Sequence, residues 1–360
     1  MRFDLNDANT LLKSSIREFV EKESPLAKAR PLMEDTQEGF SKALYAQLAE
    51  LGYLGLTLPE SEGGSAAGAI GLAVVLHEMG RVAFPGPFLD LVLVEAVLYR
   101  MGGPEASQLL QEIVAGGKIV LLARPEAVDG VEVIPPQTRF AQGHIRGTKR
   151  PVPFGASADV LLVTTAEGLA LVPRPREGWK AILLPVFDHA QRFVEISLDS
   201  VGTLLADKQR ADTLLEEVDL LGALGASALL LGLMERSLEL ALDYIKERKA
   251  FGRTIGSFQV LQHRAADMWI RTESSRSAVY RAAWALENKL DEAPLLVASA
   301  KAYCGDSARF VCAETIQVFG GVGYTWEYDP HIYFKRVKTL EQLYGSTGSQ
   351  LEAALKAQRI

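Results

Sequence analysis

The segment from Arg248 to Gln259 carries the side chains best suited to bind a phosphorylated ligand. Arg248 offers a planar fork of N–H donors that matches a pyrophosphate. Phe251 can cover the face of an adenine or a ribose, and Gln259 can hydrogen-bond to polar ligand edges. The same spacing is also typical of a glycine-containing turn between two helices with a solvated arginine, so both interpretations stand on this segment alone.

A second segment of this kind runs from Gln317 to Glu327 and contains Gly320, Gly321 and Gly323. Paired glycines after a long helix let the backbone approach a ligand closely and expose amide donors. A helix C-cap followed by a turn explains one glycine well, but three within four residues less well.

Together, the two segments resemble those of the acyl-CoA dehydrogenases, and the resemblance extends over essentially the whole chain. Leu51–Leu56 and Pro59–Gly64 are similar to the N-terminal signature of that family, and Glu78–Arg81 is similar to its following helix. The resemblance implies an FAD enzyme that desaturates acyl-CoA thioesters, with electron-transfer flavoprotein as the electron acceptor.

In this family the flavin is shared across a subunit interface, and the two motifs of one subunit hold the adenosine and pyrophosphate end of its neighbour's FAD. The resemblance therefore implies cofactor-binding roles for residues that are all intact here: Arg248, Phe251, Gln259, Gln317, Gly320 and Gly321. Thr347 matches a further family contact, on the flavin side.

The positions that would face the flavin ring differ from the family pattern. Members carry a motif like Thr-Glu-Pro-x-Ala-Gly-Ser-Asp, and the matching stretch here, Ala123–Gly130, lacks the threonine and the Gly-Ser pair. A second family contact, Trp-Ile-Thr or Trp-Ile-Ser, falls near Arg150–Pro153, where no tryptophan or hydroxyl occurs. Donors to the ring are therefore missing.

The proton-abstracting glutamate of the family also has no counterpart. Members usually read Tyr-Glu-Gly-Thr, whereas this chain reads Tyr-Gly-Ser-Thr at Tyr344–Thr347, which places Gly345 at the base position. Some members carry the base early in the first long C-terminal helix, and that place holds Gly222. Removal of the α-proton needs a positioned carboxylate, so a homo-oligomer should be a poor dehydrogenase.

Three hypotheses follow. In the first, the chain is the non-catalytic subunit of a heterotetrameric acyl-CoA dehydrogenase for lipids or steroids, and a homologous partner carries the glutamate. In the second, it is an active homo-oligomer with an unrecognised base such as Glu327 or Glu341. In the third, it is a flavin-free structural or regulatory paralogue. A nitroalkane-oxidase-like chemistry is disfavoured because its base is a carboxylate at the same position.

The elements that must position these residues follow from hydrophobic periodicity. Helical spacing predicts helices over 68–81, 88–101, 105–115, 212–246, 259–290 and 294–319, among others, whereas short aliphatic runs between Lys118 and Val201 predict strands. The expected fold is α+β and mainly α: an N-terminal helical domain (1–118), a middle β domain (119–205) and a C-terminal four-helix bundle (206–360).

Composition limits the class of protein. The chain has 360 residues and a net charge of −7, which argues against nucleic acid as a main partner. Cys304 and Cys312 lie about 12 Å apart along one helix, too far to bridge, and no cluster has metal-ligand spacing. The N-terminus lacks a signal-peptide core, and Val218–Met234 reads as a buried helix rather than a membrane span. A cytoplasmic location is expected.

Overall fold

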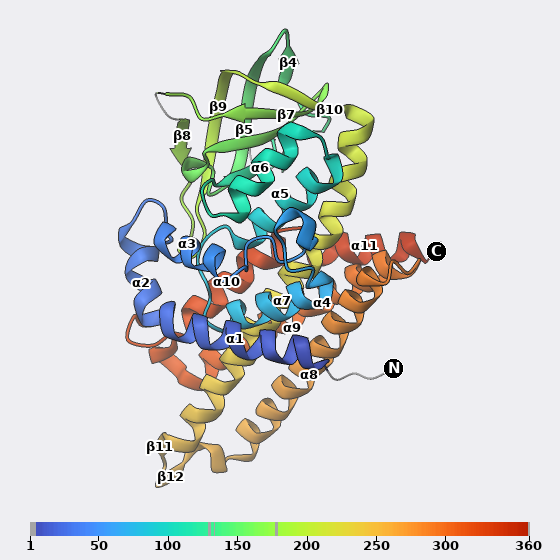
Figure 1. Ribbon diagram of the computed structural model, residues 1–360. Helices are drawn as coiled ribbons and strands as arrows, with labels where there is room; N and C mark the ends of the chain where they lie inside the picture. The colour runs from blue at the N-terminus through green and yellow to red at the C-terminus, as the bar shows by residue number, and fades with distance from the viewer. Residues whose placement is uncertain (1–4, 129–130, 133, 177–178, 359–360) are drawn as a thin grey trace. The chain divides into compact units, whose positions relative to one another are not determined.

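The computed structural model describes residues 5–128, 131–132, 134–176 and 179–358. Helices make up most of it, and the strands β1 to β10 lie in the middle of the chain, whereas the hairpin strands β11 and β12 lie between α7 and α8 (Figure 1). Contacts between Cα atoms divide the chain into two compact units. One comprises Met1–Ala27, Gly68–Phe84 and Leu220–Ile360, and the other comprises Lys28–Ala67 and Pro85–Asp219.

The first unit is a helical bundle. Its helices are α1 (Asp7–Glu23), α4 (Gly68–Arg81), most of α7 (Lys208–Glu247), α8 (Gln259–Glu287), α9 (Ala293–Phe319), α10 (Pro330–Gln342) and α11 (Thr347–Ala357). Helix α9 packs against α8, α10 and α11, and α4 packs against α1 and α8. Between α7 and α8 lie the hairpin strands β11 (Lys249–Ala250) and β12 (Arg253–Thr254) and the short helix η3 (Ile255–Ser257), whereas η4 (Gly320–Tyr324) follows α9.

Local sequence explains where several helices begin and how closely two of them approach. The side chains of Asn6 and Ser346 cap α1 and α11 by accepting a backbone N–H. Helices α4 and α7 meet at glycines: a Cβ at Gly232 would lie 2.0 Å from the carbonyl oxygen of His77, and one at Gly80 would lie 2.3 Å from that of Leu229. This crossing is possible only without side chains.

The predicted buried helix at Val218–Met234 is confirmed. It forms the middle of α7, where Val218 and Met234 are 3% and 0% exposed. By length and hydropathy α7 is the one helix in the described part of the chain that passes as a candidate membrane span, but 78% of its most apolar window is buried, as in the core helix of a folded protein.

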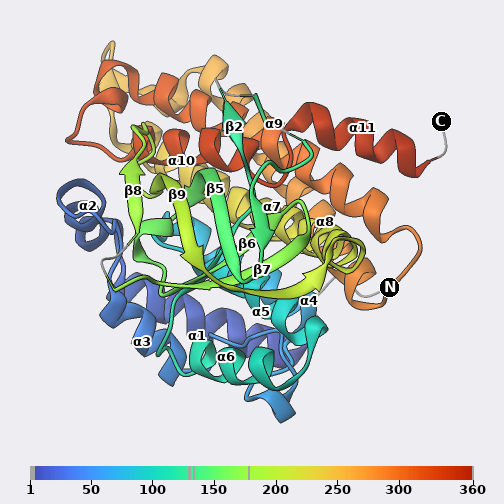
Figure 2. The same ribbon diagram turned by 90° about the horizontal axis from the view of Figure 1, so that it is seen from above.

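The second unit contains two four-stranded sheets and shorter helices. One sheet has the order β1-β6-β7-β10, with β1 and β6 parallel, and the other has the antiparallel order β4-β5-β9-β8. Strands β5, β9 and β8 lie side by side in Figure 2. The strands are β1 (Val120–Ala123), β2 (Ala127–Val128), β3 (Val131–Glu132), β4 (Arg139–Ala141), β5 (His144–Pro153), β6 (Val160–Thr165), β7 (Gly168–Pro173), β8 (Lys180–Leu183), β9 (Phe193–Val201) and β10 (Thr203–Asp207).

The helices of this unit are most of α2 (Leu26–Asp35), α3 (Lys42–Glu50), η1 (Glu60–Glu62), α5 (Phe88–Met101), α6 (Pro104–Val114) and η2 (Gly155–Ser157). The chain is therefore α+β and mainly α, with helices before and after a strand-rich middle, as predicted. Helices α4 and α5 have the predicted bounds. The three-domain division at 118 and 205 stays a prediction.

Candidate functional site: a cofactor clamp without a base

The first predicted ligand segment forms a tight hairpin. Arg248 follows directly on α7, and the chain then reverses through Phe251 and Gly252, which connect β11 to β12. Both turn residues have positive φ, +54° and +79°. Figure 1 shows the hairpin at the end of α7 and α8. Positive φ is strained for a bulky residue, and Phe251 is nevertheless 93% exposed. An exposed, strained aromatic side chain suggests a ligand contact.

The second predicted segment follows the end of α9. Gly320 has a φ of +67°, and a Cβ added at Gly320 or Gly321 would meet nothing within 4 Å. The backbone is therefore accessible to a ligand at both glycines. Gln317, in the last turn of α9, is exposed as well.

Aromatic rings hold these two segments together. The ring of Tyr244, in the last turn of α7, stacks on Phe319 at the end of α9, with centroids 4.1 Å apart. The ring of Tyr328 meets both of them edge-on. Since Arg248 and Gly320 directly follow these helix ends, the predicted residues of both segments lie in one region. We call Arg248–Gln259 and Gln317–Gly321 the clamp segments.

Three polar side chains of the clamp segments have no hydrogen-bond or ion-pair partner among the residues that the structure describes. Arg248, Gln259 and Gln317 are exposed, and none of these side chains makes a hydrogen bond or ion pair with a residue that the structure describes. Arg253 of the same segment, by contrast, covers the ring of Phe258 at 4.2 Å. A free guanidinium, an accessible aromatic ring and open glycine backbone fit the adenosine and pyrophosphate end of FAD.

The base position lies in the turn between α10 and α11. Gly345 has a φ of +96°, a conformation that favours glycine, and it carries no side chain. Thr347 opens α11, and its hydroxyl is buried without a hydrogen-bond partner in the described part of the chain. An unsatisfied buried hydroxyl fits the flavin-side contact that the sequence predicts for Thr347.

The alternative base position is occupied. The ring of Tyr344 packs over Gly222 so closely that a Cβ there would lie 2.4 Å from the Cδ1 atom. Gly222 thus accommodates a ring from the α10–α11 turn. No carboxylate reaches this place from position 222.

Two acids proposed as substitute bases lie in unsuitable settings. Glu341 is 5% exposed and pairs with Lys338 at 2.8 Å and with Arg309 at 3.9 Å. Glu327 is exposed in the segment that follows η4. A paired structural carboxylate and a solvated one both differ from a poised general base.

In the stretch matched to the flavin-ring motif, the charged side chains form ion pairs and hydrogen bonds with other residues of the chain. The buried ammonium of Lys149 donates to Glu126 at 2.7 Å and to Thr164 at 2.9 Å. Arg124 pairs with Asp219 through two N–H donors. We call Arg124, Glu126 and Lys149 the strand cluster. Asp129 and Gly130, which complete the matched stretch, lie outside the described residues.

The electrostatics of Glu126 agree with this pairing. Burial alone raises the pKa of its carboxyl, but hydrogen bonds from Lys149, Thr138 and the amide of Gln137 lower it more, so that the net pKa lies below its usual range. The strand cluster therefore presents an ionised, fully bonded pair in place of the hydroxyl donors that the family motif supplies.

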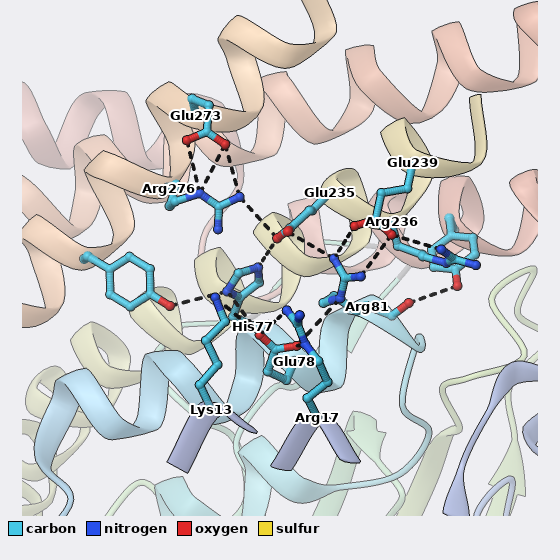
Figure 3. Close-up of polar contacts among 12 residues, drawn as sticks. Lys13, Arg17, His77, Glu78, Arg81, Glu235, Arg236, Glu239, Glu273 and Arg276 are labelled. Atoms are coloured by element: carbon cyan, nitrogen blue, oxygen red, sulfur yellow. Dashed lines mark hydrogen bonds and ion pairs between the residues drawn. The ribbon is translucent and has the colours of Figure 1, made fainter. Parts of the chain in front are cut away.

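A partly buried charge cluster joins α1, α4, α7 and α8 (Figure 3). Glu78, fully buried, accepts two hydrogen bonds from Arg17, at 2.8 and 3.0 Å. Arg81 pairs with Glu239 at 2.8 and 2.9 Å and with Glu235 at 3.1 Å. Sequence reasoning singled out only Glu78–Arg81. The signal for the rest was the 235–239 spacing of glutamates along α7.

The protonation of this cluster is that of a structural network. Burial lowers the pKa of His77, which contacts Glu235 through Nε2 and Tyr280 at 3.3 Å through Nδ1. Burial raises the pKa of Glu235, but the hydrogen bond with His77 and the charges of Arg276 and Arg81 more than offset it and hold the pKa well below its usual range. Each acid has a base beside it, so the cluster fixes helices rather than moving protons.

A cavity of about 620 Å³ lies in the strand-rich unit, lined by residues that include Trp179, Lys180, Asp199 and Thr203. None of the predicted site residues lines it. The candidate site is therefore the clamp and the base turn, not this hollow.

Comparisons with known proteins agree with these features. A family model described as acyl-CoA dehydrogenase, N-terminal domain, matches residues 6–117, and one described as acyl-CoA dehydrogenase, C-terminal domain, matches residues 221–358. The chain is 30% identical over 337 residues to acyl-CoA dehydrogenase IpdE2 of Mycobacterium tuberculosis, covering 93% of this chain and 92% of that protein. IpdE2 of Mycolicibacterium smegmatis is 29% identical, covering 96% and 97%.

Solved structures give the same result. The ChsE4-ChsE5 complex from Mycobacterium tuberculosis has a chain that is 27% identical, with a TM-score of 0.87 and coverage of 100% and 99%. A steroid ACAD variant is 25% identical, with a TM-score of 0.86 and 98% coverage of each chain. Butyryl-CoA dehydrogenase from Megasphaera elsdenii, at 23% identity and a TM-score of 0.87, shares the fold.

The chain thus belongs to the acyl-CoA dehydrogenase family, the flavoprotein oxidoreductases that act on acyl-CoA. Their cofactor is FAD, and the clamp segments of this chain fit one end of it.

Proposed function

We propose that this chain is the non-catalytic subunit of a heteromeric acyl-CoA dehydrogenase. Its clamp segments hold the adenosine and pyrophosphate end of an FAD whose ring lies in the site of a homologous partner subunit. The partner carries the glutamate that removes the α-proton of the acyl-CoA thioester. Bound FAD supplies the redox chemistry by accepting a hydride from the β-carbon.

One contrast supports this division of roles. The side chains that would serve a neighbour's FAD are exposed and unpaired among the described residues, whereas the base is absent and the stretch that would serve the chain's own flavin ring is bonded to itself. An enzyme acting alone needs both halves in each subunit.

In this proposal each clamp residue has a defined task. Arg248 binds the pyrophosphate through its guanidinium, and Phe251 covers the adenine or ribose. Gln259 and Gln317 hydrogen-bond to polar edges, and the amides at Gly320 and Gly321 approach the phosphates. Thr347 offers its hydroxyl to the flavin side.

The substrate class proposed is a bulky acyl-CoA, such as a steroid side-chain or ring thioester. It rests on the likeness to a steroid ACAD and to the ChsE4-ChsE5 complex. We further propose a heterotetramer located in the cytoplasm that passes electrons to electron-transfer flavoprotein.

The test is to prepare the chain alone and together with the product of an adjacent gene of the same family. Bound FAD per chain and acyl-CoA-dependent reduction of a dye acceptor are measured for each preparation. One FAD per pair, with turnover only in the pair, is the expected result. Full FAD occupancy and turnover by the lone chain would contradict the proposal. Two FAD-free preparations would favour a structural or regulatory paralogue.

A further inference from the structure

The turn at the base position is held by two side chains that the resemblance does not account for. Tyr344 and Gly345 both have positive φ, +57° and +96°. Two consecutive residues in this region need support from outside the turn, because the left-handed conformation is disfavoured for tyrosine.

The first support is Lys301 of α9, which is 1% exposed. Its ammonium donates to the carbonyl oxygen of Gly345 at 2.8 Å and to that of Glu341 at 3.2 Å. One buried charge thus binds both the end of α10 and the turn that follows it. Burying an ammonium is costly unless such hydrogen bonds compensate.

The second support is Gln350 of α11. Its Nε2 atom donates to the carbonyl oxygen of Tyr344 at 2.8 Å. This amide also occupies the direction that a side chain at position 345 would take: a Cβ there would lie 2.2 Å from Nε2 and 3.0 Å from Cδ. A side chain at residue 345 would therefore have to displace this amide.

We propose that Gln350 and Lys301 close this chain's own base position: they hold the glycine turn through its carbonyls, and a side chain at residue 345 must displace the Gln350 amide from its hydrogen bond with Tyr344. With Tyr344 packed over Gly222, both base positions of the family are occupied. The inference rests on the proposed function, because that function identifies residue 345 as the base position. Each pair then turns over acyl-CoA only at the partner's site.

If Gln350 closes the base position, substitutions at residues 345 and 350 should have non-additive effects on the melting midpoint. Gly345→Glu should lower the melting midpoint of the chain by roughly 5 °C or more, because the new side chain meets both the amide and an unfavourable φ. Adding Gln350→Ala should restore about half of that loss, since it removes the overlap but not the backbone strain. The matched control is Gln342→Ala, an exposed glutamine at the end of α10, which should restore none.

Additive effects of Gly345→Glu and Gln350→Ala would overturn the proposal. If Gly345→Glu does not fold, Gly345→Ala gives a smaller form of the same cycle, because the overlap already begins at Cβ. The double-mutant cycle is measured on the lone chain without flavin. Its result can therefore contradict the closed base position without contradicting the proposed heteromeric enzyme, and the test of the heteromer can fail without contradicting the closed base position.

The pH dependence tests Lys301 separately. Burial lowers its pKa from the ordinary 10.5 to about 8, against opposing effects of Cys304 and Glu341 beside it. Between these two values lysine is neutral in the folded chain and charged in the unfolded one, so the folded state gains stability as pH rises. Below about 8 both states are charged and the gain is absent.

The melting midpoint of the wild type should therefore rise relative to that of Lys301→Met between pH 8 and 10.5. Lys338→Met is the control, because Lys338 pairs with Glu341 from a more exposed position and donates to no turn carbonyl. A difference between wild type and Lys301→Met that does not change with pH would contradict a buried ammonium beneath the turn.

Discussion

The clamp segments and the strand cluster use charged side chains in opposite ways. In the clamp, Arg248 is exposed and has no partner among the described residues. In the strand cluster, Lys149 is fully buried and donates to three oxygen atoms, one of them on Glu126. Groups that would meet another subunit's cofactor are left open, whereas the groups matched by sequence to the family's flavin-ring motif are bonded to one another. Mutations should therefore separate folding from cofactor binding.

The largest expected effect is on stability, in the strand cluster. Glu126→Ala leaves the buried ammonium of Lys149 without its carboxylate, which should lower the free energy of unfolding by about 3 kcal/mol. The clamp is unchanged, so the fraction of pairs that bind FAD, measured at a temperature where the variant is folded, should stay at the wild-type value. Urea unfolding measures the first quantity and flavin absorbance the second.

The control for this variant is Glu195→Ala. Glu195 pairs with Arg150 at 2.8 Å in the same unit, but both side chains are partly exposed, so the loss should stay below about 1 kcal/mol. If Glu126→Ala instead released FAD from a folded pair, the strand cluster would serve the cofactor and the contrast would be wrong.

The second prediction concerns the clamp segments, where a mutation should weaken FAD binding without lowering stability. Arg248→Ala should weaken FAD binding by the pair roughly 10- to 100-fold, since a charge-assisted bond to phosphate contributes about 1.5–3 kcal/mol. The melting midpoint of the lone chain should not change, because the guanidinium has no partner among the described residues of that chain. Arg146→Ala removes an exposed arginine that pairs with Asp199, and FAD titration should show no effect. Equal affinities for the Arg248 variant and wild type would remove the main support for the clamp.

The long helices could be predicted from sequence because their local hydrophobic patterns indicate a helix without information from tertiary contacts. Gly68–Arg81 begins at a glycine, Phe88–Met101 lies between Pro87 and Gly102, and both are rich in apolar residues; both are helices with those bounds. Helix α2 was not predicted: it is short and contains Pro31, which normally interrupts a helix. Tertiary packing, which no local pattern records, decided its conformation.

The site divides in the same way. Arg248, Phe251 and Gly320 could be predicted as ligand-binding residues because their residue types, which are known from the sequence, determine that chemistry. Gln350 and Lys301 could not, since their importance comes from the carbonyl groups they meet across the bundle. The hairpin at Phe251 was also missed, because phenylalanine is not a residue that a turn with positive φ normally selects.

A third prediction concerns Glu95 and tests whether a buried carboxyl outside the strand cluster is also fully hydrogen-bonded. Glu95 of α5 is fully buried; one oxygen accepts the amide of Gly55 at 3.2 Å, and the other has no partner among the described residues. Burial raises the pKa of this carboxyl from 4.5 to about 8. The folded state therefore holds a proton that the unfolded state releases above 4.5, and stability falls as pH rises toward 8.

Glu95→Gln should remove this dependence and stabilise the chain at pH 8 by on the order of 1–2 kcal/mol relative to wild type, with little change at pH 4.5. Urea unfolding at both pH values measures it. Glu105→Gln, on the exposed start of α6, is the control and should leave the pH dependence as in wild type. A Glu95 variant less stable than wild type at pH 8 would mean that the carboxyl is ionised and bonded, as in the strand cluster.

The smallest effect sharpens the comparison most, because one residue should show opposite effects on folding and binding. Phe251 has a φ of +54° and is 93% exposed, and its ring meets that of Phe258 edge-on with centroids 6.1 Å apart, a contact that offsets little of the backbone strain in the lone chain. Asparagine tolerates this conformation, so Phe251→Asn should raise the melting midpoint by roughly 2 °C. The same change should weaken FAD binding by the pair about 5-fold, through loss of ring contact. Lys289→Asn is matched to it: Lys289 is exposed with a φ of +51°, so the midpoint should rise similarly while FAD affinity stays constant. If the melting midpoints of both variants rise and neither loses FAD affinity, Phe251 is merely a strained turn residue. A loss of FAD affinity confined to Phe251→Asn means that the strain is maintained for the cofactor.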